Sequence, residues 1–564
     1  MRNFCLFQIL QFTLFCFIIV RAEIVLKDEE TPEATIPNGK MFGSVRNSRS
    51  GRRLYSFFDI PYAKPPERFA LAEPAENWEG VLDASMSKSQ CPQAFPGLQM
   101  DTMIGYDGSD DCLHANVYVP EDAVKAKKTM PVLVLIHPGM FVFGYGNMLR
   151  PTYLLDEDFV FVSFNYRIGA LGFLTTNDDS APPNRGLHDQ ILALKWVQNN
   201  IAHFGGDPTK VTLIGVSAGA CMAHMLMLSP LSAGLFSSAI LHSGTALSPW
   251  AIEKHPVKTA QGFAAELKCP TTSNAEMIEC LKKVPGEELI SVQLSRKWVL
   301  GFTYRFLPTI ETTGSNRIIP DAPEKLLEEG KFDKHPIVIG AIERDGLIGS
   351  ATILEDEHLV EQFNEDWNSV APYALMFDED AEDHLTPEER NKISTKIRQF
   401  YFGDKLINRE TLDNLTHLYS DFWFIRGIEK TAGMHAKHGA TVYPYMFSYK
   451  GHYSFLHLQG ITEHNEPTHG DDALYLFSTG FIPDLKKHPK DEEFSRKFVH
   501  LWLSFILTGK PSATFGSAQD WHPLSPTEYP IKWYNIDEDT RYEEYPYEER
   551  VKFWEDIIGS HFKM

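Results

Sequence analysis

Short apolar runs alternate along this chain with segments whose apolar side chains recur at helical spacing. Residues 132–136 and 159–164 are apolar on both faces, as strands are when helices cover both sides of a mostly parallel sheet. Residues 187–201 place apolar side chains three or four positions apart, which is the spacing of a helix packed on such a sheet. This order predicts an α/β fold with a doubly wound, mostly parallel central sheet and helices on both faces. The expected strands are residues 132–136, 159–164, 211–215, 337–340 and 441–447, and the expected helices are residues 187–201, 220–228 and 494–507.

A sharp turn with a serine at its apex is predicted at residues 215–219, which read Gly-Val-Ser-Ala-Gly. This segment joins an expected strand to an expected helix, and its glycines remove the Cβ atoms that would collide in so tight a turn. The turn would push the Ser217 hydroxyl out of the sheet and aim the Ala218 N–H at the helix start, where an oxyanion can be received. Ser217 is therefore the candidate nucleophile.

A nucleophilic serine needs a base to take its proton and an acid to orient that base. The chain has 21 histidines, so spacing alone does not select one. In a hydrolase with this turn the order is Ser, then Asp or Glu, then His, on loops after strands. Asp345 follows the expected strand at 337–340, and His469 opens a helical run. A lone Asp or His is usually a solvated surface side chain, so the residues alone do not establish either role. Asp345 and His469 therefore stay candidates.

The first 22 residues carry the pattern of a secretory signal peptide. A positive charge at Arg2 precedes an almost unbroken apolar run from Phe4 to Val20, and a cut after Ala22 fits this pattern. The run is nearly long enough to span a membrane, so an anchor is the alternative interpretation. No second apolar stretch of that length follows. We therefore predict a signal peptide at residues 1–22 and a secreted, extracellular product without a membrane anchor.

Five cysteines remain once the first 22 residues are removed. An odd number in an oxidising compartment predicts two disulfides and one free thiol. Cys91 with Cys112 and Cys269 with Cys280 are the economical pairs, because each pair closes a local loop. The remaining cysteine, Cys221, lies one turn after the elbow serine, and we expect it to be buried in the core.

Charge narrows the partners of the chain. The formal net charge is −22 at pH 7 and there is no basic cluster, which argues against nucleic acid and anionic membranes as partners. Asn414 begins an Asn-Leu-Thr sequon, so it is a candidate glycosylation site in the secretory pathway. We predict no metal and no cofactor, and no feature of the sequence decides the oligomeric state.

Several motifs, from about Pro37 to near the C-terminus, resemble those of the type-B carboxylesterase and cholinesterase family. They are Ile60-Pro-Tyr-Ala-Lys-Pro-Pro66, Asp110-Asp-Cys-Leu-His-Ala-Asn-Val-Tyr118, Asn165-Tyr-Arg-Ile-Gly-Ala-Leu-Gly-Phe173, Asp189-Gln190, Phe204-Gly-Gly-Asp-Pro208, the elbow at 215–219 and His469-Gly-Asp-Asp472. The resemblance implies an α/β-hydrolase fold and one catalytic domain over residues 23–564. The two disulfides also match the family's pattern.

The same resemblance assigns the catalytic roles. It implies Ser217 as nucleophile, His469 as general base and then general acid, and Asp345 as the acid that orients His469. Most relatives carry Glu at this last position, and Asp keeps the charge with a shorter reach.

The predicted oxyanion loop departs from the family pattern. Relatives usually read His-Gly-Gly-Gly-Phe after the strand, whereas residues 137–141 read His-Pro-Gly-Met-Phe. By position, the donors are the backbone N–H groups of Gly139, Met140 and Ala218. Pro138 lacks an N–H but stands at a position that does not donate. The Met140 side chain is expected in the acyl pocket.

The residues at positions that contact substrate in the family narrow the range of expected substrates. Cholinesterases place a Trp where this chain has Thr102, and commonly a Glu where it has Val216, so the resemblance disfavours choline esters. Trp250 and Ser243 fall in family positions near the acyl side of the pocket. The substrate-contacting residues are expected to be Trp250, Phe141 and Val216.

The leading hypothesis is a secreted serine hydrolase that cleaves small-molecule carboxylic esters through an acyl-enzyme intermediate. Apolar or amphipathic esters are favoured by the apolar surroundings of Ser217. The motif wording is most similar to secreted insect carboxylesterases, including members like juvenile hormone esterase. The alternative is a catalytically weak or inactive cholinesterase-like adhesion or binding protein, which the unusual oxyanion loop keeps open.

Overall fold

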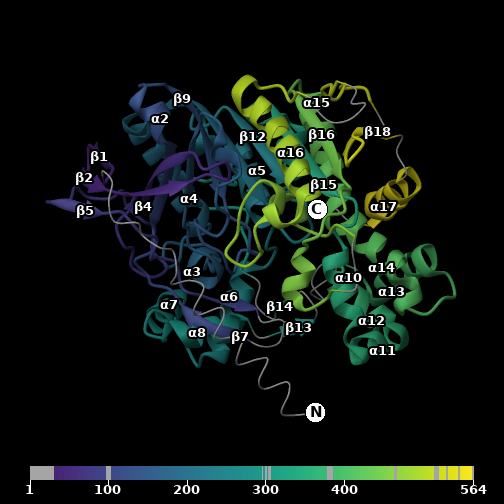
Figure 1. Ribbon diagram of the computed structural model, residues 1–564. Helices are drawn as coiled ribbons and strands as arrows, with labels where there is room; N and C mark the ends of the chain where they lie inside the picture. The colour runs from purple at the N-terminus through teal and green to yellow at the C-terminus, as the bar shows by residue number, and fades with distance from the viewer. Residues whose placement is uncertain are drawn as a thin grey trace, which may run out of the picture.

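The computed structural model is built around an eleven-stranded sheet, counted over the described residues (Figure 1). The described residues are 31–96, 103–294, 296–298, 301–302, 306–377, 385–462, 466–512, 520–528, 531–543 and 547–561. The predicted signal peptide at 1–22 and the position of Thr102 lie outside them.

The sheet is parallel in its centre and antiparallel at its edges. Every neighbouring pair from β17 through β10 is parallel, whereas β18 on one side and β8, β4 and β3 on the other pair antiparallel. The order across the sheet is β18 (Arg541–Glu543), β17 (Trp533–Ile536), β16 (Val442–Phe447), β15 (Ile337–Ile342), β12 (Ser238–His242), β11 (Gly206–Val216), β9 (Met130–Ile136), β10 (Val160–Phe164), β8 (His114–Pro120), β4 (Arg53–Pro61) and β3 (Ser44–Asn47).

Smaller sheets and many helices surround this core. The small sheets contain β1 (Glu33–Ile36), β2 (Gly39–Phe42) and β5 (Val81–Asp83), then β6 (Gln93–Pro96) with β7 (Met103–Asp107), and β13 (Arg296–Trp298) with β14 (Gly301–Phe302). The helices are α2 (Glu121–Lys125), α3 (Gly169–Phe173), α4 (Arg185–Asn200), α5 (Ala218–Leu228), α6 (Pro256–Glu266), α7 (Asn274–Leu281), α8 (Gly286–Gln293), α9 (Pro323–Glu328), α10 (Leu347–Leu354), α11 (Glu357–Glu365), α12 (Trp367–Ala374), α13 (Pro387–Phe402), α14 (Leu412–Tyr419), α15 (Arg426–Lys437), α16 (Pro489–Thr508) and α17 (Glu548–His561).

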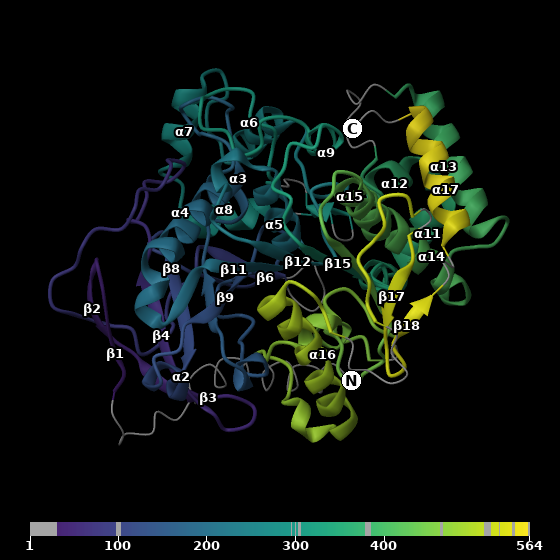
Figure 2. The same ribbon diagram turned by 90° about the horizontal axis from the view of Figure 1, so that it is seen from above.

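Helices cover both faces of the sheet, which explains why a central strand such as β9 is apolar on both of its faces. Alternate residues of a strand point to opposite faces. In β9, Val132 and Val134 pack in the cluster that holds α4 and α5, while Leu133 and Leu135 pack in the cluster that holds α16. Figure 2 shows α16 on one side of the sheet and α4, α5 and α15 on the other. The predicted doubly wound architecture is confirmed, as are the strands and helices that the sequence indicated.

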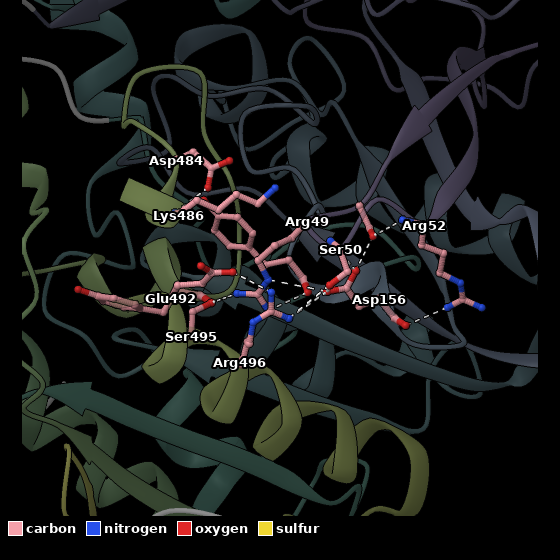
Figure 3. Close-up of polar contacts among 12 residues, drawn as sticks. Arg49, Ser50, Arg52, Asp156, Asp484, Lys486, Glu492, Ser495 and Arg496 are labelled. Atoms are coloured by element: carbon pink, nitrogen blue, oxygen red, sulfur yellow. Dashed lines mark hydrogen bonds and ion pairs between the residues drawn. The ribbon is translucent and has the colours of Figure 1, made fainter. Parts of the chain in front are cut away.

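A polar cluster joins the turn between β3 and β4 to α16, which comes much later in the chain (Figure 3). The Arg49 guanidinium donates to Ser495 Oγ at 2.7 Å and lies over the Tyr153 ring. Ser50 Oγ donates to Asp156 at 2.7 Å, which ties the same turn to the segment before β10. This network holds the amino-terminal edge of the sheet to the helix that covers its face. Among the described residues, no helix is long and apolar enough to cross a membrane.

Candidate active site

The chain reverses sharply at Ser217, between the end of β11 and the start of α5. Ser217 has φ 56° and ψ −125°, a conformation that a non-glycine residue rarely adopts. A Cβ on Gly215 would overlap the Gly219 carbonyl, and a Cβ on Gly219 would overlap the Ile136 carbonyl at the end of β9. The glycines therefore let the elbow close and let β9 approach it.

Ser217, His469 and Asp345 form one hydrogen-bonded chain. The Ser217 Oγ and His469 Nε2 atoms are 2.7 Å apart, and His469 Nδ1 is 2.9 Å from Asp345 Oδ1. An ionised carboxylate only accepts hydrogen bonds, so Nδ1 carries the imidazole proton and Nε2 accepts from the serine hydroxyl. The structure thus brings together three residues that the sequence placed 124 and 252 positions apart. The arrangement can activate a hydroxyl for nucleophilic attack.

The Asp345 carboxylate is completely buried at the end of β15. Its second oxygen, Oδ2, accepts from the Ile342 N–H at 2.9 Å and from the Ser243 hydroxyl at 2.8 Å. Burial raises the pKa of Asp345, and the hydrogen bonds from His469, Ile342 and Ser243 oppose that rise. Ser243 was expected near the acyl side of the pocket, and the structure shows a different contact for its hydroxyl. Its buried hydroxyl faces the acid, which provides the acceptor that such a group requires.

Two buried carboxylates hold the loop that carries His469. Asp471 accepts from the backbone N–H groups of Thr468 at 2.9 Å and Phe455 at 2.7 Å, and burial raises its pKa to about 7. Asp472 accepts from His242 Nδ1 at 2.6 Å and from the Tyr445 hydroxyl at 2.9 Å. Burial alone would raise the pKa of Asp472, but these partners lower it. Sequence reasoning quoted both aspartates in a motif and gave neither a role.

The predicted oxyanion loop follows β9 beside the elbow. Gly139 has φ 130°, and a Cβ there would overlap the Phe143 carbonyl, so the turn requires glycine. Met140 and Phe141 also have positive φ, at 54° and 63°. Behind the loop, burial lowers the pKa of His137 to about 4, so its imidazole is neutral at pH 7. Ala218, the other expected donor, is the first residue of α5.

The predicted pocket residues differ in how much surface they expose. Trp250 is half-buried, whereas Phe141 is 1% exposed and Val216 is 2% exposed. Val216 packs in the core cluster that lies against α16. Contact of Phe141 or Val216 with a substrate stays a prediction. Met140 is half-buried and packs against a cluster of Ala94, Val142, Ile290 and Leu294. Its position in an acyl pocket stays a prediction.

A string of aromatic rings connects the oxyanion loop with the candidate base. The Phe141 ring centroid lies 6.3 Å from that of Trp250, and Trp250 lies 5.8 Å from Phe424. Phe424 in turn packs 4.6 Å from the His469 ring. Sequence reasoning missed Phe424. The available signal was Asp421, a charged residue within an otherwise apolar run.

Both expected disulfides form in the structure. The Cα atoms of Cys91 and Cys112 are 5.0 Å apart, and those of Cys269 and Cys280 are 5.7 Å apart. Cys221 is free and buried in α5, and burial raises the pKa of its thiol. This thiol is therefore protonated and unreactive at neutral pH.

The Asn414 sequon lies in α14. Asn414 Nδ2 donates to the Tyr401 carbonyl at 2.8 Å, and the buried Thr416 hydroxyl pairs with that of Ser350. A glycan on Asn414 would take one of the two Nδ2 hydrogens and leave one N–H, and its attachment stays a prediction. Within the described ranges, no group of three or more His, Cys, Asp or Glu side chains could hold a metal ion.

Comparison with known proteins identifies the family and the fold of this chain. The Carboxylesterase family profile matches residues 30–554. Esterase FE4 from Myzus persicae is 36% identical over 90% of this chain and 90% of that protein. Neuroligin-2 from Homo sapiens is 31% identical over 86% of this chain and 61% of that protein. The crystal structure of juvenile hormone esterase from Manduca sexta, with OTFP covalently attached, matches with a TM-score of 0.81 and 27% identity, over 94% of this chain and 100% of that chain. The chain therefore belongs to the carboxylesterase family, has the α/β-hydrolase fold and is a carboxylic ester hydrolase.

Proposed function

We propose that this carboxylesterase is a secreted serine esterase whose nucleophile is Ser217. His469 acts as general base and then general acid, and Asp345 orients it. The single observation that carries the proposal is the hydrogen-bonded chain, with 2.7 Å from Ser217 Oγ to His469 Nε2 and 2.9 Å from His469 Nδ1 to Asp345 Oδ1. The order of the three side chains, and the tautomer inferred from the carboxylate beside Nδ1, support this assignment because acyl transfer requires both.

The reaction follows from these positions. Ser217 Oγ attacks the ester carbonyl carbon while His469 Nε2 takes the hydroxyl proton. The backbone N–H groups of Gly139, Met140 and Ala218 donate hydrogen bonds to the carbonyl oxygen and stabilise its developing negative charge. The bond to the alcohol oxygen then breaks, and His469 returns its proton to the departing alcohol. Water repeats the sequence on the acyl-enzyme, which releases the acid and restores the serine.

Apolar or amphipathic esters are the proposed substrates. The half-buried Met140 and Trp250, together with the Phe424 ring beside His469, support an apolar surface next to the nucleophile. Apolar walls with a few placed polar groups are typical of small-molecule sites. A relative that is named juvenile hormone esterase fits this substrate class.

Secretion is proposed from the amino-terminal sequence and the disulfides. Residues 1–22 carry the signal-peptide pattern, which leaves residues 23–564 as the catalytic domain. The bonds Cys91–Cys112 and Cys269–Cys280 support an oxidising compartment, since cytosolic proteins rarely keep disulfides.

A fluorophosphonate probe tests the nucleophile. The folded, secreted protein should incorporate one phosphonyl group per chain, and peptide mapping should find it on Ser217, because only an activated serine attacks phosphorus at neutral pH. The Ser217→Ala variant and heat-denatured protein are the controls, and neither should be labelled. Hydrolysis of esters of graded acyl and alcohol size, with Ser217→Ala as the blank, then defines the substrate class.

The competing function is the weakly active or inactive binding protein that the unusual oxyanion loop keeps open. This alternative predicts that folded protein with both disulfides intact is not labelled and hydrolyses none of the esters. Stoichiometric labelling with turnover would exclude it.

A further inference from the structure

A π-helical turn, Ser420–Ile425, lies between α14 and α15, and all six of its side chains are buried. The π-helix is rare, occurs mostly as single turns, and is frequent at functional sites. Helix α14 packs beside α10, which follows Asp345, while α15 packs on β15 and β16. The turn therefore crosses from one to the other near the carboxyl end of β15, where the candidate acid lies.

One side of this turn contacts three parts of the active site. Ser420 Oγ accepts from the N–H of Gly346, the residue after Asp345, at 2.9 Å. The Trp423 carbonyl accepts from Trp250 Nε1–H at 3.0 Å. The Phe424 ring packs on the His469 imidazole, with centroids 4.6 Å apart and planes tilted by 33°. The turn thus reaches the residue after the candidate acid, the predicted pocket residue Trp250 and the candidate base.

The other side of the turn is held by α13 and α17. Asp421 accepts from the Tyr401 hydroxyl at 2.6 Å and pairs with Arg550, whose Nε is 3.3 Å away. The Tyr401 oxygen also accepts from Trp554 Nε1–H at 2.7 Å. The Phe422 ring packs 4.5 Å from Trp554. The turn is therefore clamped between the carboxyl-terminal helix and the active site.

We propose that Phe424 is a positioning residue for His469 and that the π-helical turn exists to aim its ring at the imidazole. The inference rests on the proposed function of His469. The His469 ring can turn about its Cα–Cβ and Cβ–Cγ bonds, and such a turn would move Nδ1 and Nε2 away from Asp345 and Ser217. The Phe424 ring packed on the imidazole face restricts that rotation. The same ring face also attracts the imidazolium that forms when His469 takes the serine proton.

The test replaces Phe424 with Leu, which fills similar space without a flat ring. Hydrolysis of 4-nitrophenyl acetate should show kcat reduced by about tenfold, with KM changed less than about twofold. The acid limb of the profile of log kcat/KM against pH should move to lower pH, because the imidazolium loses a favourable neighbour. Phe424→Tyr keeps the ring and should restore both quantities. If Phe424→Leu does not fold, Phe424→Met provides the same comparison with a flexible side chain.

Phe422→Leu is the matched control. Phe422 and Phe424 share the turn and are 4% and 3% exposed, but Phe422 faces α17. Its variant should lose stability while keeping kcat and the pH profile. The carboxylates of Asp345 and Asp472 face His469, and Asp421 lies on the turn, but both Leu variants retain all three.

Fluorophosphonate titration of the wild type separates failure of this inference from failure of the proposed function. An unlabelled wild type would refute the nucleophile itself. With a labelled wild type, equal losses of kcat in Phe422→Leu and Phe424→Leu would overturn the positioning role, as would an unmoved acid limb in Phe424→Leu. Restoration by Phe424→Tyr alone, with the shifted limb, is the result that supports it.

Discussion

Replacing Asp345 with Asn tests the acid of the proposed triad, because it exchanges one carboxylate oxygen for an NH₂ group. Asp345 Oδ2 accepts from two donors, the Ile342 N–H and the Ser243 hydroxyl, whereas Oδ1 faces His469 Nδ1. The asparagine amide has only one acceptor oxygen, and the Ile342 N–H and the Ser243 hydroxyl both need an acceptor at the Oδ2 position. The NH₂ group must therefore face His469, so Nδ1 becomes an acceptor and the imidazole proton moves to Nε2. In that tautomer His469 cannot take the serine proton.

The expected loss of activity is large, and the expected change in stability has a defined sign. A wrong imidazole tautomer costs about 10⁴-fold in kcat, which equals about 5.5 kcal/mol of transition-state stabilisation. Burial raises the pKa of Asp345 in the folded state above its ordinary value of about 4. The ionised carboxylate therefore lowers the free energy of unfolding. This loss is absent at pH values below the pKa of Asp345 in the unfolded chain and is complete above its pKa in the folded protein. The free energy of unfolding of Asp345→Asn, relative to wild type, should rise across that interval.

Two measurements check these expectations. One is kcat on 4-nitrophenyl acetate at neutral pH, with Ser217→Ala as the blank, and the other is urea unfolding from pH 4 to pH 8. Gly346 follows the new amide, so intact mass must show that it has not hydrolysed back to the carboxylate. Asp345→Glu is the control: it keeps the charge and the tautomer, and its extra methylene should cost about 1–3 kcal/mol of stability. Activity of Asp345→Asn within tenfold of wild type would show that Asp345 does not orient the base, and a pH-independent stability difference would refute the burial argument.

Two further substitutions examine the loops around Ser217. Gly219→Ala should lower the free energy of unfolding in urea by about 3 kcal/mol or more, because its Cβ would overlap the Ile136 carbonyl. Gly433→Ala in α15 meets no atom within 4 Å and should stabilise by about 0.5–1 kcal/mol, and equal effects of the two would contradict the close approach of β9. Met140→Gly keeps the N–H donor and deletes the side chain, so kcat/KM for bulky acyl esters should rise about tenfold more than for acetate. An equal change across the acyl series would place Met140 outside the acyl pocket.

The central strands could be predicted because burial on both faces leaves an uninterrupted apolar run. The antiparallel edge was harder to predict, as β8 shows. Its Asn116 is 3% exposed, yet it accepts from the Asp59 N–H at 3.2 Å and donates to Ser163 at 3.2 Å. A polar residue satisfied by neighbouring strands makes a buried strand look exposed in the sequence. Periodicity therefore identified five strands of the parallel region but missed the antiparallel edge. It also missed the central strand β12, whose apolar run between Ser238 and His242 is only three residues long.

In the candidate site, too, some features could be predicted from local sequence and others could not. The elbow glycines around Ser217 act within five residues, so a local pattern reveals them. Asp345 and His469 could be chosen only from chain order and family motifs, because no local pattern distinguishes them from other Asp and His residues. Ser243 and Phe424 act through contacts with residues 102 and 45 positions away. Such contacts depend on the assembled fold, so the apolar run around Phe424 reads simply as core.

Four of the eleven non-glycine residues with positive φ in the described part of the chain lie around the candidate site, and the sheet stabilises their backbone. Met140, Phe141, Ser217 and Ser243 all have φ between 51° and 63°, which costs about 1–3 kcal/mol at each non-glycine position. The N–H groups of Ser217 and Ser243 donate at 2.8 Å to the carbonyls of His242 on β12 and Gly340 on β15. The Phe141 carbonyl accepts from Gly169 at 2.6 Å. Each of these three residues is therefore anchored by a backbone hydrogen bond, two of them to central strands, so the serine hydroxyl and the acid's partner keep their positions only while the sheet is intact.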